Sequence, residues 1–468
     1  MLGNQKKSLK LKRLFQKVFC NSFFSFLKKF KLILFPKVPF LNQIKRLFAS
    51  DFYKFSAVLL SSNAIAQIIV FVAYPFITRL YSPEIFGVFN LFLVIVGILK
   101  LLTTGQYELA IVLPESDKKA SALFHLSLLL TVGISLFFFI FIILFGGSIT
   151  VFFHQEQLAS FLPYLPIYLL LSGFWQTMNY YFVRHKKYYN LGVYSITQSV
   201  IGSATKCLLG FKGFLFFGLL WGQLLGQLLA TLTSIMLGKS TFKHLKQWDK
   251  KEIAVVAETY SNFPKYQLPH ALLNMFAANL PVLLLSFYFD MEKIGLFSMA
   301  LTIGLTPVTL FSNSICQVMF RKMSELVQNK EKIKHICFNF CKMCLIFILP
   351  FFILFMFVPD SFFTVLFGEK WTGVGFYFKC MLPCLFLSTL VGSLSFIPDI
   401  FFKQKAAAQI EFIYTALKAI ALLTGVYLKN FDLAIIFYCI IIVIMLIVKL
   451  AWYFGIIKKY EFSKEIKL

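Results

Sequence analysis

Twelve segments of this sequence are each long and apolar enough to cross a lipid bilayer, and this constrains the fold more than any motif does. A membrane-spanning helix needs about 20 mostly apolar residues. The predicted spans are residues 55–78, 86–106, 121–145, 163–183, 191–210, 214–237, 268–289, 295–320, 336–358, 380–400, 408–428 and 433–456. With 59% hydrophobic and 14% charged residues, the chain could not form an ordinary soluble surface. The sequence therefore predicts a multi-pass helical membrane protein.

The lysines and arginines between the spans alternate from side to side and predict the orientation. If the N-terminus is cytoplasmic, 35 of the 46 lie in internal segments, 6 in outer loops and 5 within spans. Such an excess follows the positive-inside rule and places both termini in the cytoplasm. The net charge of +26 is then mainly an orientation signal, and we expect no nucleic-acid partner.

A basic segment, residues 1–54, precedes the first span. It lacks the early apolar run and the small-residue cleavage site of a secretory signal peptide. Its lysines alternate with phenylalanines, which suits a segment lying on an anionic inner leaflet, and a basic tail without fixed structure is the equal alternative.

The nine cysteines are expected to serve as small apolar residues rather than as disulfides. Cys337, Cys341 and Cys344 have the C-x3-C-x2-C spacing of some iron–sulfur enzymes. They begin a predicted membrane helix, however, where this spacing simply marks one helical face. We expect no metal and no cofactor.

The chain repeats itself at an offset of 208 residues, in residues 81–89 and 289–297. The identical positions are Glu84 and Glu292, Gly87 and Gly295, and Phe89 and Phe297. Two six-span halves that start from the same side predict an all-α membrane protein of about 12 transmembrane helices, in two pseudo-symmetric six-helix lobes around a central cavity. The expected parts are the segment 1–54, an N-terminal lobe 55–237, a cytoplasmic connector 238–267, a C-terminal lobe 268–456 and a cytoplasmic tail 457–468.

Polar residues recur at helical spacing within several spans and indicate a candidate substrate pathway. In the eighth span they step by three or four from Ser298 to Arg321, and the second span shows Lys100, Thr104 and Glu108. Shorter stripes of polar residues lie along the first, fourth and sixth spans. Such stripes face protein or a wet cavity, and the alternative is that they only join helices by hydrogen bonds.

Five lysines lie inside spans, where each costs about 2.5–3.5 kcal/mol at a helix centre. Lys418 is expected to pair with Glu411, and Lys342 and Lys449 are assigned no role because they can reach the span ends. The other two belong to the predicted substrate-binding residues. These are Asn63, Gln67, Arg79, Lys100, Arg184, Lys206, Asn313, Gln317 and Arg321.

Four stretches resemble signatures of polysaccharide flippases. They are ITRLYSPEIFGVF at 77–89, GQYELAIVLP at 105–114, QVMFRKMSE at 317–325 and LFGEKW at 366–371. In combination they resemble the O-antigen and capsule-precursor flippases of the multidrug/oligosaccharidyl-lipid/polysaccharide exporter superfamily. The chain departs from that pattern at Gln106, where the family has arginine, and in residues 1–45, which extend beyond the family's usual start.

The resemblance implies a transporter of the bacterial cytoplasmic membrane, rather than an enzyme, that serves lipopolysaccharide or other surface-polysaccharide biosynthesis. Its substrate would be an undecaprenyl-diphosphate-linked oligosaccharide, flipped to the periplasmic leaflet by ion-coupled alternating access. Expected partners are membrane lipids, a polysaccharide polymerase and chain-length proteins.

The energy source is expected to be an ion gradient. The sequence holds no G-x-x-x-x-G-K-[ST] loop, so ATP is not expected to drive transport directly. We expect coupling to protons or sodium, with Glu108 as the candidate carrier, because partial burial would raise the pKa of its carboxyl group. The alternative is that Glu108 pairs permanently with Lys100 or Arg184.

Three other functions stay open at this stage. A multidrug exporter of the same superfamily would share the fold, but its cationic substrates favour acids over lysines in the cavity. A polysaccharide polymerase or ligase commonly carries a large outer catalytic loop, whereas the longest outer loop here is 359–379. A scramblase without energetic coupling would show the same sequence features.

Overall fold

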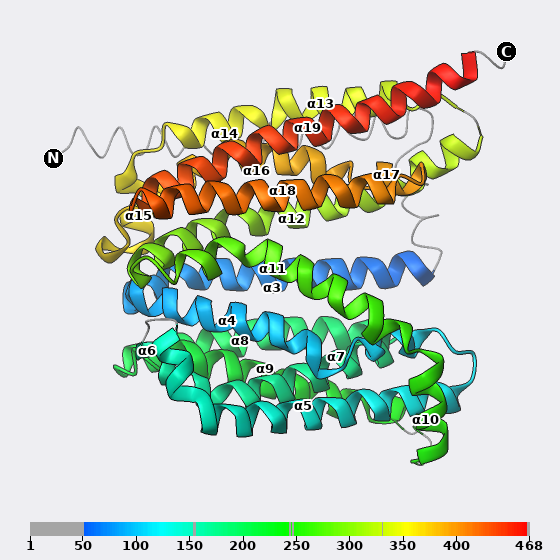
Figure 1. Ribbon diagram of the computed structural model, residues 1–468, viewed down its shortest axis with the longest axis vertical. Coiled ribbons are helices and arrows are strands. Elements are labelled where there is room, and N and C mark those ends of the chain that lie inside the picture. Colours follow the sequence, from blue (N-terminus) through cyan, green and yellow to red (C-terminus); the bar gives the residue numbers. More distant parts are fainter. Residues whose placement is uncertain (1–50, 153–155, 243–244, 246–247, 330, 466–468) are drawn as a thin grey trace. The chain divides into compact units, whose positions relative to one another are not determined.

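The computed structural model describes residues 51–465 apart from 153–155, 243–244, 246–247 and 330 (Figure 1). The predicted surface segment 1–54 lies almost entirely outside the described residues, as does the end of the predicted tail. The regular elements of the described part are all helices. They are α3 (Asp51–Leu80), α4 (Pro83–Thr103), η1 (Tyr107–Val112), α5 (Asp117–Phe152), α6 (Glu156–Ala159), η2 (Leu162–Tyr164), α7 (Leu165–Arg184), α8 (Tyr188–Phe211), α9 (Gly218–Phe242), α10 (Lys250–Thr259), η3 (Phe263–Gln267), α11 (Leu268–Leu285), α12 (Met291–Gln328), α13 (Lys334–Phe347), α14 (Leu349–Met356), α15 (Asp360–Phe367), η4 (Glu369–Trp371), α16 (Val374–Ser393), α17 (Ile397–Ile400), α18 (Gln404–Tyr427) and α19 (Phe431–Glu465).

The all-α membrane fold predicted from the sequence is confirmed. Among the described residues, 11 helices are long and apolar enough to span a membrane. Helix α8, which covers the predicted fifth span, has 24 residues but is not one of them. Its serines, threonines, Gln198 and Lys206 lower its mean hydropathy. The number of twelve spans therefore stays a prediction.

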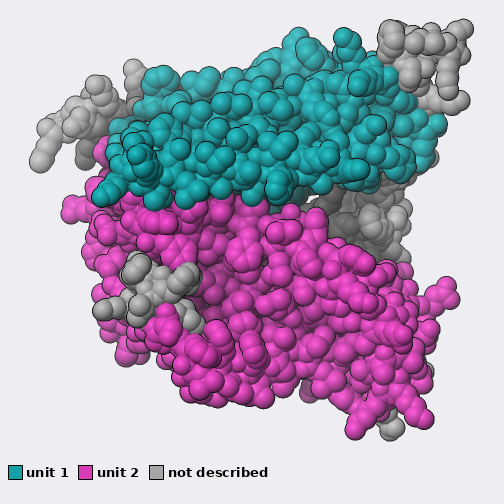
Figure 2. All heavy atoms as spheres, viewed as in Figure 1, with its two compact units in different colours: residues 1–46, 300–360, 375–468 teal, residues 47–299, 361–374 magenta. Residues whose placement is uncertain are grey.

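The described residues form two compact units (Figure 2). Those of unit 2 lie within 47–299 and 361–374, and those of unit 1 within 300–360 and 375–468. By packing, α11 and the first turns of α12 thus belong with the N-terminal half, whereas the sequence repeat begins the C-terminal lobe at 268. The reason is that α11 packs along α4, where Gly97 leaves room for the Met275 side chain. The two six-helix lobes stay a prediction.

The 208-residue repeat is visible in unit 2 as a contact between equivalent residues. Gly87 and Gly295, which the repeat aligns, lie where α4 and α12 cross, and a Cβ at either glycine would overlap a main-chain carbonyl of the other helix. Asn90 donates a hydrogen bond to the Ser298 hydroxyl at 2.7 Å, again at an offset of 208. These reciprocal contacts are those of a local pseudo-twofold axis.

Small residues set the spacing of the other helices in unit 2. Gly202 of α8 lies against Gly222 and Gly226 of α9, which form a G-x-x-x-G pattern, so the two backbones approach closely. Helix α3 packs on α8, where Gly192 leaves room for Ser62. Close approach of this kind suits membrane helices, whose association depends on van der Waals packing.

Helix α4 ends where two consecutive residues adopt the left-handed backbone conformation. Gly105 and Gln106 have φ of 58° and 63°, and the helix stops at Thr103. The Gly105 N–H still donates back to the Leu102 carbonyl at 3.0 Å, but the left-handed backbone turns the following residues away from the helix axis, so the helical hydrogen bonds stop there. Glu108 then lies in the separate helix η1. The expected continuous stripe from Lys100 to Glu108 on one helix is therefore wrong.

In unit 1, Glu411 of α18 pairs with Lys449 of α19. The sequence predicts a pair between Glu411 and Lys418 on the same helix, and this prediction is wrong. Instead, the Lys418 ammonium lies 4.2 Å from the ring centre of Tyr414, and Lys449 lies 4.5 Å from the same ring. Helical spacing identifies candidate partners on the same helix only, and the partner of Glu411 is Lys449 on the neighbouring helix α19.

The three cysteines with C-x3-C-x2-C spacing lie on one buried face of α13. Cys337, Cys341 and Cys344 are at most 8% exposed, and their thiols are free. They pack as small apolar residues.

Candidate functional site

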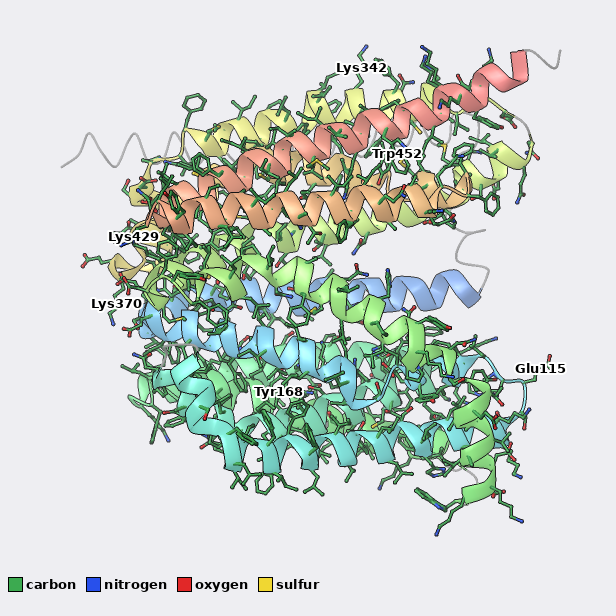
Figure 3. All side chains as sticks on the ribbon, viewed as in Figure 1. Glu115, Tyr168, Lys342, Lys370, Lys429 and Trp452 are labelled. Carbon is green, nitrogen blue, oxygen red and sulfur yellow. The ribbon has the colours of Figure 1, made fainter. Side chains whose placement is uncertain are left out.

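A polar cavity of about 270 Å³ lies inside unit 2, between α4, α7, α8 and α9. Its lining residues are Leu93, Val96, Gly97, Lys100, Tyr168, Ser172, Trp175, Gln176, Tyr194, Gln198 and Gln227. Figure 3 labels Tyr168 among the helices of unit 2. The lining holds one cation, no acid, three amides and three hydroxyls. This composition differs sharply from the apolar surfaces that membrane helices usually bury.

Lys100, the cavity's cation, comes from the last turn of α4. Within the described part of the chain, its ammonium group makes no ion pair. The Gln176 Oε1 atom is buried and accepts no hydrogen bond there either. Buried polar groups are normally satisfied, so each such exception calls for an explanation. Among the described residues, the cavity thus has a cation without an ion-pair partner, and one of its lining residues has a buried oxygen without a donor.

An aromatic pair forms another wall of the cavity. The rings of Trp175 from α7 and Tyr194 from α8 are stacked, with centroids 3.3 Å apart and an interplanar angle of 6°. Beside them, Gln227 donates to the Ser172 hydroxyl at 3.0 Å. That bond joins α7 to α9 and matches the alternative in which polar stripes connect helices. The polar wall is therefore held in place by contacts of its own.

Lys206, a second predicted site residue, is connected to this cavity through one glutamine. Its ammonium donates to Gln223 Oε1 at 3.1 Å, and Gln223 Nε2 donates to the Tyr168 hydroxyl at 3.2 Å. The same ammonium lies 5.4 Å from the ring centre of Phe89. Lys100 and Tyr168 both line the cavity, and Lys206 is linked to Tyr168 through Gln223. That the two lysines belong to one substrate pathway stays a prediction.

Arg79 lies away from the cavity, at a joint between two of the signature segments. Its guanidinium donates to the Val365 carbonyl at 3.0 Å. Next to it, the fully buried Trp371 indole donates to the carbonyls of Thr78 and Tyr81 at 2.7 and 3.2 Å. The segment 366–371 thus closes over the end of α3. Because these two segments are both expected on the periplasmic side, their contact is consistent with the predicted topology.

Arg184 lies at the end of α7 and ties down the segment that follows η1. Its guanidinium donates to the carbonyls of Ile111, Pro114 and Glu115 and pairs with Asp117 at 2.8 Å. A shallow cavity of about 550 Å³ opens here. It is lined by Val112, Leu113, Pro114, Glu115, Asp117, Val183, Arg184, His185, Lys186 and Tyr188. Since its donors are already engaged, Arg184 acts first as a structural anchor.

Glu108 is almost completely buried in η1, at 2% exposure. No ion pair joins it to Lys100 or Arg184 among the described residues, and its Oε2 atom lacks a hydrogen-bond partner there. Burial raises the pKa of its carboxyl group above the usual value. The neighbouring Thr104 hydroxyl opposes that rise only partly, since no hydrogen bond of normal geometry joins the two side chains.

The remaining predicted site residues are spread over both units. On α3, Asn63 is half-buried and Gln67 is exposed. Asn313 is exposed on α12 in unit 1. The side chains of Gln317 and Arg321 lie outside the described residues. Among the predicted residues whose side chains the structure describes, Lys100 alone lines the unit 2 cavity.

Several lining residues are not identified by the sequence. Tyr168 and Trp175 are seven residues apart and share a face of α7 with Ser172. That spacing is visible in the sequence, but aromatic residues at helical spacing usually mark ordinary packing. Nothing in the sequence indicates that Tyr194 of another helix would stack on Trp175.

Comparisons of the sequence with known proteins find similarity to polysaccharide biosynthesis proteins. A family model described as "Polysaccharide biosynthesis protein" matches residues 76–375. The teichuronic acid biosynthesis protein TuaB of Bacillus subtilis (strain 168) is 28% identical over 112 residues, which are 24% of this chain and 23% of that protein. The match thus spans about a quarter of this relative's length.

Solved transporter structures share the fold. The lipid II flippase MurJ, in an inward closed conformation, superimposes with a TM-score of 0.66 at 15% identity, covering 88% of this chain and 90% of that chain. An inward-facing multidrug resistance MATE transporter of the MOP superfamily gives 0.58 at 13% identity, covering 86% and 95%.

Proposed function

Because the chain belongs to a family of polysaccharide biosynthesis proteins and has the fold of MOP-superfamily transporters, we propose that it flips a lipid-linked oligosaccharide across the membrane. Membership of the family supports a role in polysaccharide biosynthesis, and the fold supports transport rather than an enzymatic reaction on sugars. By their names, TuaB acts in teichuronic acid biosynthesis and MurJ flips lipid II. A glycan attached to a lipid carrier combines the two.

The observation that carries this proposal is the polar cavity of unit 2. A cation and three amides that line a cavity between membrane helices fit a hydrophilic, anionic cargo, since buried polar groups need partners of their own. A multidrug exporter for cationic amphiphiles would have to bind its substrates next to an unpaired lysine. That arrangement would be repulsive, so the flippase fits better.

The proposed cargo is an undecaprenyl-diphosphate-linked oligosaccharide, moved from the cytoplasmic to the periplasmic leaflet of the bacterial inner membrane. Its diphosphate needs cations in a medium of low dielectric. Lys100 and Lys206 are suited to meet the diphosphate or neighbouring acidic sugars at different stages of transport, whereas Arg79 and Arg184 already donate to carbonyl oxygens. Both termini are proposed to be cytoplasmic.

Energy coupling is proposed to involve Glu108. A buried carboxyl group without a charged partner binds a proton more readily than an exposed one, so its charge state can change with the surroundings of η1. In the proposed cycle, Glu108 is protonated when buried and releases the proton when η1 becomes hydrated.

The test uses a strain in which this gene is deleted. Lipid-linked glycan intermediates should accumulate, as measured by mass spectrometry, and surface glycan should fall. Complementation with the parent should restore both, Lys100→Gln should restore them poorly, and Lys342→Gln, an exposed lysine of unit 1 labelled in Figure 3, should match the parent. Unchanged intermediates in the deletion strain would contradict a flippase.

Purified protein provides the second arm. In proteoliposomes, the parent should expose a labelled undecaprenyl-diphosphate glycan to a membrane-impermeant reagent, and an imposed pH gradient should change the rate. Transport of cationic dyes without glycan flipping would favour the multidrug exporter instead.

A further inference from the structure

The cavity of unit 2 is too small for a whole lipid-linked oligosaccharide. Its volume of about 270 Å³ falls just below the range of about 300–1,000 Å³ that holds drug-sized ligands. It matches one sugar ring with a substituent. The cavity can therefore hold one group of the cargo while the rest extends outside it, and the lining residues indicate the chemistry of that group.

We propose that this cavity is a recognition site for one negatively charged sugar residue of the glycan, bearing either a carboxylate or a phosphate. The inference rests on the proposed flippase function and specifies its substrate class. All the residues that line the cavity belong to unit 2.

Charge provides the first argument. The lining contains Lys100 and no acid, and the described residues give its ammonium no ion-pair partner. A lysine inside a membrane helix costs about 2.5–3.5 kcal/mol, and an anion bound beside it would offset part of that cost. Lys206 adds positive potential to the same wall through Gln223 and Tyr168.

The uncharged wall provides the second argument, because it distinguishes a sugar from a plain anion. Gln176 and Gln198 contribute two amides to the lining, and an amide group can both donate to and accept from sugar hydroxyls. Ser172 and Gln227 already bond to each other and form a fixed polar surface. The Trp175–Tyr194 stack offers an aromatic surface on which the apolar face of a sugar ring can pack.

The site is tested with the full-length protein in lipid nanodiscs, by titration calorimetry with free sugars. The probes are sodium glucuronate and glucose 1-phosphate, with glucose and inorganic phosphate as references. We expect the two charged sugars to bind at least tenfold more tightly than glucose or phosphate alone. The stronger of the two then identifies the anion. Equal binding of glucose would overturn the charge argument, and equal binding of inorganic phosphate would overturn the sugar argument.

Variants locate the binding in this cavity. Lys100→Gln should weaken charged-sugar binding at least tenfold, which is about 1.4 kcal/mol, while Lys100→Arg should retain most of it. Lys342→Gln is the matched control. If Lys100→Gln does not fold, Gln176→Glu serves instead, because a carboxylate beside Lys100 would neutralise the cation and exclude the anion. Parent-like binding by a folded Lys100→Gln or Gln176→Glu variant would overturn the proposal.

Flipping assays separate this inference from the proposed function. If the parent flips lipid-linked glycan but the cavity variants bind and flip as the parent does, the recognition site is wrong and the flippase stands. If the parent flips no glycan at all, the function fails whatever the cavity binds.

Discussion

The crossing of α4 and α12 at Gly87 and Gly295 makes a quantitative prediction. In Gly295→Ala the new methyl group would overlap the Pro83 carbonyl, and in Gly87→Ala it would overlap the Met291 carbonyl. Main-chain atoms cannot rotate away as a side chain can, so the helices must separate. We therefore expect both substitutions to destabilise the protein.

The magnitude combines three contributions. Alanine in a helix interior gains about 1 kcal/mol over glycine where space is open. Overpacking costs about 1–3 kcal/mol, and separating the helices also breaks the Asn90–Ser298 hydrogen bond, worth about 1 kcal/mol. The net loss for Gly295→Ala is therefore about 1–3 kcal/mol. Gly133→Ala on α5 is the control, because no atom of its surroundings lies within 4 Å of where the new methyl group would stand, and it should gain up to about 1 kcal/mol.

The assay is the midpoint of thermal unfolding in detergent, read as the monodisperse fraction after heating. Gly133→Ala should unfold at or above the parent's midpoint, and Gly87→Ala and Gly295→Ala below it. The double variant should lose less than the sum of the single losses, since either methyl group already separates the same contact. A Gly295→Ala midpoint equal to that of Gly133→Ala would refute the close crossing.

Three further substitutions test other contacts. Trp371→Phe keeps the aromatic ring but removes the donor to two carbonyls at the end of α3, so we expect a loss of about 1–3 kcal/mol in thermal unfolding with normal membrane insertion. Burial raises the pKa of the Glu108 carboxyl group in the folded protein above its value in the unfolded chain. The parent should therefore lose thermal stability as the pH rises from the unfolded-state pKa to the folded-state pKa, and Glu108→Gln should show a weaker pH dependence. A variant with the same pH profile as the parent would contradict the burial of this group. Lys449→Gln should cost about 1 kcal/mol, because Glu411 is half-exposed, and the double variant that also carries Glu411→Gln should recover part of it.

The helical spans and the repeat could be predicted from the sequence because both depend on local features. A run of apolar residues suffices for a membrane helix, and an alignment suffices for Gly87 and Gly295. The end of α4 could not be predicted, since Gln106 is an uncommon residue for a left-handed conformation. Likewise, the pairing of Glu411 with Lys449 depends on how two helices pack.

The candidate site was only partly predictable for a similar reason. A lone lysine in an apolar span is conspicuous, so Lys100 and Lys206 were identified. The cavity around Lys100 needs four helices in register, and the stack of Trp175 on Tyr194 exists only after α7 and α8 have packed. Sequence periodicity describes one face of one helix at a time.

The residues that carry the family resemblance and the residues that line the cavity have different physical roles. Trp371 satisfies carbonyls at the end of α3, and Gly368 adopts a φ of 100° with little room for a side chain beside Arg79. A change at such positions would affect folding whatever the cargo is. Lys100 and Gln176, in contrast, line the polar cavity, and among the described residues the Gln176 Oε1 atom has no hydrogen-bond partner. Under the proposed function, a change of cargo would therefore act on the lining of the cavity, while the contacts around Trp371 keep the same fold.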